Sequence, residues 1–61
     1  MNATQVIRLL KKYGWKLKTQ KGSHKQFIHP ERSGKITVAD HGKDEIPPGT
    51  LKSIKRQAGI E

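Results

Sequence analysis

Cysteine is absent from the 61 residues, and no apolar run approaches the length needed to cross a membrane, about 18 residues. The first absence excludes a disulfide framework and a thiolate zinc site, and the second excludes a membrane-spanning helix. The three histidines, His24, His29 and His41, show no metal-ligand pair at helical spacing. We therefore expect a protein without metal, cofactor or membrane association.

Acidic residues are also few. Five Asp and Glu stand against 13 Lys and Arg, which gives a net charge of +8. Such an excess favours polyanionic partners, nucleic acid first and an acidic protein second. The N-terminus opens into a charged, amphipathic segment, which is not typical of a secretory signal, so we expect a cytoplasmic protein. The length predicts a single domain over residues 1–61 with a thin core.

Two segments have the apolar spacing of amphipathic helices. The first covers residues 3–13, where Asn2 can cap the helix, Gln5 can reach back to it, and Gly14 can end it. Its apolar stripe consists of Val6, Ile7, Leu9, Leu10 and Tyr13. The second covers residues 50–58, closed by Gly59, with Ile60 folding back as an apolar cap contact. Its stripe consists of Leu51, Ile54 and Ala58.

The segment between the helices predicts three short strands, over residues 15–20, 23–29 and 35–39. Lys21-Gly22 forms the first turn, Pro30 stops the second strand, and residues 31–34 and 40–48 are polar loops. Short connections predict an antiparallel meander. The predicted fold class is α+β, in the order α-β-β-β-α, with both helices packed on one face of a three-stranded sheet.

Alternation along the strands predicts what lies on the other, open face. If Phe27 points into the core, then His24, Gln26 and Ile28 point away from it. The same reasoning sends one set of first-strand residues inward: Trp15, Leu17 and Thr19. It sends the other set outward: Lys16, Lys18 and Gln20. A histidine among amines and amides could hold a phosphodiester, although a solvated sheet face with an incidental histidine fits the same pattern.

The segment Gly22-Ser23-His24-Lys25-Gln26-Phe27 resembles the glycine-serine-histidine segment of HicA toxins, in which an aromatic follows three residues after the histidine. Tyr13-Gly14-Trp15 is similar to the family's corner between helix and strand, and His29-Pro30 to the end of its second strand. Two further stretches resemble its terminal helix: Pro47-Pro48-Gly49-Thr50-Leu51 and Lys55-Arg56-Gln57-Ala58-Gly59-Ile60. The combination covers nearly the whole chain.

The resemblance implies a fold like the double-stranded RNA-binding domain and a ribonuclease that cleaves messenger RNA and blocks translation. It implies a HicB-like antitoxin that covers the site, and His24 as the catalytic residue. The residues that we expect to contact RNA are Lys16, Lys18, Gly22, Ser23, Lys25 and Gln26. Gly22 can equally be a simple turn residue, and Ser23 a residue that starts a strand.

The implied chemistry suits these residue types. RNA supplies its own nucleophile, the 2′-hydroxyl, and an imidazole can remove or supply a proton near neutral pH, while ammonium groups steady the charge on phosphorus. His29 and His41 are candidates for a second acid–base group, but His29 shares the parity of Phe27 and His41 lies in a loop, so a lysine or water could serve instead.

We expect no metal in the reaction, because the carboxylates of Glu31, Asp40, Asp44, Glu45 and Glu61 lie in loops or at the chain end and should not converge on His24. Two other functions stay open. One is a non-catalytic RNA-binding module of the same fold. The other is a DNA-binding protein, which the separation of the two helices by three strands disfavours.

Overall fold

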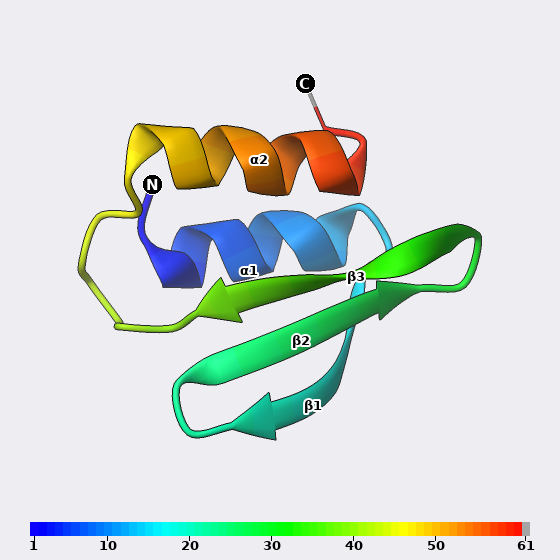
Figure 1. The fold of residues 1–61 in the computed structure, drawn as a ribbon, viewed down its shortest axis with the longest axis horizontal. Coiled ribbons are helices and arrows are strands. Elements are labelled where there is room, and N and C mark those ends of the chain that lie inside the picture. Colours follow the sequence, from blue (N-terminus) through cyan, green and yellow to red (C-terminus); the bar gives the residue numbers. More distant parts are fainter. Residues whose placement is uncertain (61) are drawn as a thin grey trace.

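The computed structural model describes residues 1–60 and arranges them as helix, three strands and helix (Figure 1). The elements are α1 (Ala3–Lys12), β1 (Lys16–Lys21), β2 (His24–His29), β3 (Arg32–Ala39) and α2 (Pro48–Ala58). The strands form one antiparallel sheet in the order β1-β2-β3. The predicted fold class and element order are therefore confirmed, whereas Glu61 lies outside the described residues.

Local chemistry sets the helix boundaries. The Asn2 side chain accepts from the Gln5 amide, and the Gln5 side chain accepts from the Asn2 amide, which completes the capping box. Gly14, with φ of 94°, ends α1, and Gly59, with φ of 74°, ends α2 in the left-handed conformation. The Ile60 amide then donates to the Lys55 carbonyl at 2.8 Å, and Ile60 is buried as predicted.

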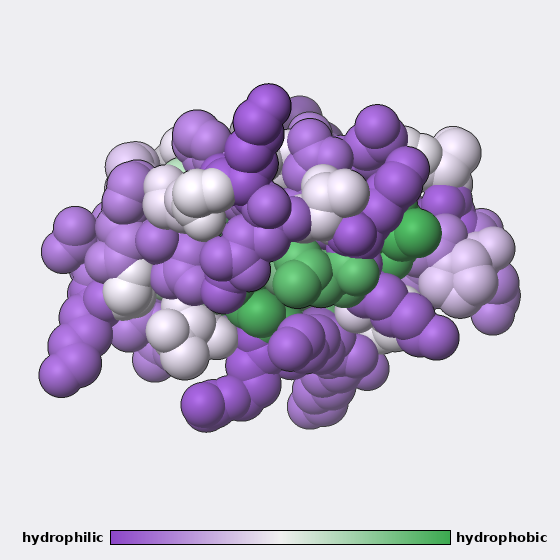
Figure 2. All heavy atoms as spheres, turned by 90° about the horizontal axis from the view of Figure 1, so that it is seen from below, coloured by the Kyte–Doolittle hydropathy of each residue, from purple (hydrophilic) through white to green (hydrophobic). Residues whose placement is uncertain are grey.

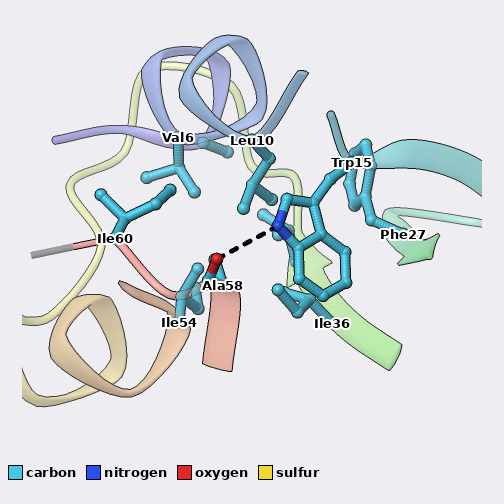
Figure 3. Packing of buried hydrophobic residues seen from close by; sticks show 10 residues of the cluster. Val6, Leu10, Trp15, Phe27, Ile36, Ile54, Ala58 and Ile60 are labelled. Carbon is cyan, nitrogen blue, oxygen red and sulfur yellow. Dashed lines mark hydrogen bonds between the residues drawn. The ribbon is translucent and has the colours of Figure 1, made fainter. Parts of the chain in front are cut away.

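Both helices bury their stripes against the same face of the sheet, on the β3 side, so that β1 lies farthest from them (Figure 1). The core contains Ala3, Val6, Leu10, Trp15, Phe27, Ile36, Val38, Ile54, Ala58 and Ile60. The Trp15 indole N–H donates to the Ala58 carbonyl at 3.4 Å, so it ties the corner after α1 to the last turn of α2 (Figure 3). The predicted placement of both helices on one face is confirmed.

The predicted alternation of β1 is wrong beyond Leu17. Leu17 pairs with Phe27, but Thr19 then pairs with Gln26, so that Lys18 is one extra residue in a β-bulge. The bulge reverses the parity: Thr19 lies on the open face, and Gln20 pairs with Lys25 on the helix-covered face. Trp15 is buried as predicted, immediately before the strand begins.

Leu17 was expected in the core and is 46% exposed. Its backbone pairing does place it beside Phe27, on the helix-covered face. However, β1 is the edge strand and the helices pack over β3, so no helix covers this position. Here the packing overrides the sequence pattern.

The boundaries of the strands differ at both hairpins. Lys21 belongs to β1, and the first turn consists of Gly22 and Ser23, so Ser23 does not start the second strand. The strand β3 begins at Arg32 rather than Lys35, because Arg32 pairs with His29 and a register shift takes up the intervening residues. The helix α2 begins at Pro48, two residues early, since proline is well suited to the first helical position.

Candidate functional site

His24 is the first residue of β2 and directly follows the Gly22–Ser23 turn. It pairs with Lys21 on one side and with Ala39 on the other, so it occupies the central strand at one end of the sheet. Its side chain is exposed, and Gly22 adopts a φ of 61° that favours glycine in this tight turn. The hairpin therefore presents the imidazole beside an ammonium group.

Polar side chains surround His24 on the open face of the sheet. Gln26 lies between Thr19 on β1 and Thr37 on β3, and the Thr19 hydroxyl donates to the Gln26 side-chain oxygen at 3.1 Å. Together these side chains line a shallow hollow of about 520 Å³. Its lining residues are Thr19, Lys21, His24, Gln26 and Thr37, joined at the edge by Gln20, whose side-chain amide donates to the Gly22 carbonyl. The hollow offers hydrogen-bonding groups and positive charge to a ligand that lies across the strands.

A second hollow, of about 360 Å³, lies where the end of the sheet meets the 40–47 loop and the start of α2. His24 lines this hollow too, together with His41, Asp44 and Glu45. Two of the five carboxylates that were not expected to converge on His24, Asp44 and Glu45, thus line a hollow that His24 also lines, and Glu45 forms an ion pair with the N-terminal ammonium. In residues 1–60, however, no three His, Cys, Asp or Glu side chains cluster in a way that could hold a metal ion.

Lys25, which was expected to contact RNA, is not brought together with the groups of the open face. It pairs with the buried Val38, and its ammonium donates to the Asp40 carboxylate at 2.7 Å. This hydrogen bond and, to a smaller extent, one from the Gly42 amide hold the pKa of Asp40 below its usual value. The Asp40 amide donates to the Ser23 carbonyl at 2.7 Å, so Asp40 fixes the loop to the turn before His24.

The remaining expected RNA contacts lie on or beside the open face. Lys16 pairs with Ile28, Gln26 lies in the middle of the face, and Lys18 is exposed in the bulge. The face also carries exposed apolar area, since Ile28 is 37% exposed. Figure 2, which views the molecule from the β1 side, shows a narrow hydrophobic strip among hydrophilic side chains.

His29 has a structural role at the far end of β2. The Glu31 amide donates to its Nδ1 at 3.0 Å, which leaves the proton of the neutral ring on Nε2 to donate to the Tyr13 carbonyl, also at 3.0 Å. Its ring meets the Trp15 ring edge-on, with centroids 5.2 Å apart. Both ring nitrogens are therefore occupied by the backbone.

Lys21, Thr37 and His41 line hollows that His24 also lines, and they were not expected there. Lys21 was assigned to a turn, and the bulge that moves it into the strand has no signal in the alternation of β1. Thr37 could have been found by alternation, because it follows Ile36 and precedes Val38, which both point into the core. His41 could be placed only with the register of β2 against β3.

The fold and this site define a class: a small, basic α-β-β-β-α domain that presents a histidine on the open, polar face of its sheet. A family model described as the HicA toxin of bacterial toxin-antitoxin systems matches residues 3–60. The chain belongs to the HicA toxin family. It is also 39% identical over 62 residues to a protein of Pseudomonas fluorescens (strain Pf0-1) named "Probable mRNA interferase HicA", covering 100% of this chain and 98% of that protein. Within residues 1–60, neither helix has the length and apolarity to cross a membrane.

Proposed function

We propose that this chain is a metal-independent endoribonuclease toxin that cleaves messenger RNA and thereby blocks translation, with His24 as its catalytic residue. Membership of a toxin family and the name of the Pseudomonas relative support the activity. The observation that carries the assignment is the position of His24. It is exposed at the start of the central strand, lines both hollows and lies opposite Lys21.

RNA would lie across the open face of the sheet with its phosphates near the lysines. Lys16, Lys18 and Lys21 supply charge, and Gln26 supplies hydrogen bonds. The backbone of Gly22 and Ser23 is accessible at the turn, because a Cβ built at Gly22 would meet nothing within 4 Å. Lys25 contributes only indirectly, by holding Asp40 beside the turn that precedes His24, because its ammonium forms an ion pair with the Asp40 carboxylate.

The reaction needs no nucleophile from the protein. His24 removes the proton of a 2′-hydroxyl, and the oxygen attacks the adjacent phosphorus while the bond to the 5′-oxygen breaks. The 5′-oxygen takes up a proton as it leaves, so the products are a 2′,3′-cyclic phosphate and a 5′-hydroxyl. The neighbouring ammonium groups stabilise the negative charge that builds on the phosphoryl oxygens.

The test compares the purified protein with its His24→Ala variant on a defined messenger transcript. General-base catalysis contributes typically ~10²–10⁴-fold, so the variant should lose at least about 10²-fold in cleavage rate. Its melting temperature and RNA affinity should stay unchanged, because the side chain is exposed. Induced expression should arrest growth only with the unchanged protein. If neither protein cuts RNA but both bind it, the chain is a non-catalytic RNA-binding module instead.

Chelation tests the metal independence of this activity separately. Cleavage should persist in EDTA, because the mechanism relies on protein side chains alone. Loss of cleavage in EDTA, with recovery on addition of magnesium, would contradict the proposed mechanism.

We also propose that the His24 face is where a HicB-like antitoxin inhibits the toxin. The face combines the Lys16 and Lys21 ammonium groups with the apolar area of Ile28, so an inhibitor should offer carboxylates and one apolar contact. Charge reversal at Lys16 and Lys18 should weaken both RNA binding and inhibitor binding. If RNA binds the saturated toxin–antitoxin complex with unchanged affinity, the inhibitor does not cover this face.

A further inference from the structure

Cleavage by the proposed mechanism requires a proton for the departing 5′-oxygen, and His24 as the base cannot hold that proton at the same moment. His29 is not available, because backbone groups occupy both of its ring nitrogens. We propose, resting on the proposed ribonuclease function, that His41 is the proton donor to the leaving group. The hollow between the sheet and the 40–47 loop is then the second half of the active site.

The strand register brings the two histidines to the same end of the sheet. Ala39 pairs with His24, and the ladder continues for one more residue, since the Asp40 amide donates to the Ser23 carbonyl at 2.7 Å. Asp40 contacts Lys25, and His41 follows Asp40 in the turn that the Gly42 amide closes, beside the end of the sheet where His24 begins β2. Both histidines line the same hollow.

The loop that carries His41 is fixed on both sides of the histidine. The Asp40 carboxylate accepts from the Lys25 ammonium at 2.7 Å and from the Gly42 amide at 3.0 Å, which closes a tight turn around His41. Further along, the Ile46 amide donates to the Met1 carbonyl at 2.9 Å, and Glu45 forms an ion pair with the N-terminal ammonium. A proton donor needs such a fixed position, because the transfer occurs only within hydrogen-bond reach.

Two carboxylates, those of Asp44 and Glu45, line the same hollow as His41. In the reaction, the 2′-oxygen gives its proton to His24 and forms a bond to phosphorus. The bond between phosphorus and the 5′-oxygen breaks, and the 5′-oxygen keeps the electron pair and takes the proton of His41. The two imidazoles end with their protonation states exchanged, and solvent restores them.

The test uses a leaving group that needs no proton. Cleavage of a messenger transcript first locates a cleavage site. Two oligonucleotides of that sequence are then made, each with a single ribonucleotide at the site. In one, oxygen bridges the phosphorus and the 5′ carbon of the leaving nucleotide, and in the other, sulfur does. A thiolate leaves without protonation. His41→Ala should therefore cut the oxygen substrate at least about 10²-fold more slowly than the unchanged protein and cut the sulfur substrate at nearly the unchanged rate. His24→Ala should be slow on both substrates.

Each alternative gives a different pattern. Equal slowing of His41→Ala on both substrates would overturn the proposal, as would full activity on both. If Lys21→Gln instead cut the oxygen substrate slowly and the sulfur substrate at the unchanged rate, Lys21 would be the proton donor and the proposal would be wrong. Thr50→Ala is the matched control, because Thr50 lines the same hollow and carries no transferable charge; it should not alter the ratio of the two rates. If the unchanged protein cuts neither substrate nor the transcript, the proposed function itself fails.

Discussion

The two faces of strand β2 carry similar side chains in different surroundings. Phe27, His29 and Lys25 lie on the face that the helices cover, whereas His24, Gln26 and Ile28 lie on the open face. On the covered face the imidazole of His29 and the ammonium of Lys25 have hydrogen-bond partners within the fold. On the open face the imidazole of His24 is exposed. The polar groups on the covered face thus have structural partners, whereas His24 on the other face stays exposed.

The largest expected contrast is in packing. Phe27 is fully buried, and Phe27→Ala should lower the free energy of unfolding by about 3–5 kcal/mol, which is a large share of the stability of a small domain. Ile28→Ala, one residue along on the open face, should cost less than about 1 kcal/mol because its side chain is already 37% exposed. Chemical denaturation of both variants measures the two costs. Equal costs would mean that the two faces are not packed differently.

Much of the fold follows from local signals that agree with one another. The capping box at Asn2 and Gln5 and the glycine ends of both helices could be predicted, because capping depends on a few neighbouring residues. The bulge at Lys18 could not, since the alternation of β1 continues unbroken through it. The exposure of Leu17 could not be predicted either, because it depends on which strand the helices cover.

The candidate site could be predicted only where local alternation along a strand decides it. Alternation from Phe27 placed His24 and Gln26 on the open face, and the structure agrees. The position of His41 depends on the register of β2 against β3 and on a turn closed by Asp40, neither of which has a pattern in the sequence. Long-range register was the missing information.

The two histidines of β2 provide a second, smaller contrast. His29→Ala removes two hydrogen bonds to the backbone and the contact with Trp15, so it should lower stability by about 1–3 kcal/mol, at about 0.5–1.5 kcal/mol per hydrogen bond. Its cleavage rate per folded molecule should stay near that of the unchanged protein. His24→Ala should show the reverse, with stability within about ±0.5 kcal/mol and cleavage lost. Thermal melts and cleavage assays on the same samples check both, and a stable but inactive His29→Ala would contradict the structural role.

The smallest expected effect concerns the ion pair beside the site. Lys25 holds the pKa of Asp40 below its usual value through a hydrogen bond, and the Gly42 amide adds to this. Because the pKa of Asp40 is lower in the folded protein than in the unfolded chain, the pair stabilises the fold at pH values above the unfolded pKa of about 3.9, and this contribution is lost as the pH falls through the folded pKa.

Lys25→Met should raise the pKa of Asp40, which an NMR titration of its side chain measures. Lys21→Met, on the open side of the same hairpin, is the control and should leave that pKa unchanged. The stability difference between Lys25→Met and the unchanged protein should therefore be constant at neutral pH and shrink below about pH 4. An unchanged pKa in Lys25→Met would mean that the ion pair does not fix Asp40, and Asp40 would then be held by its contacts with the Gly42 amide and the Ser23 carbonyl.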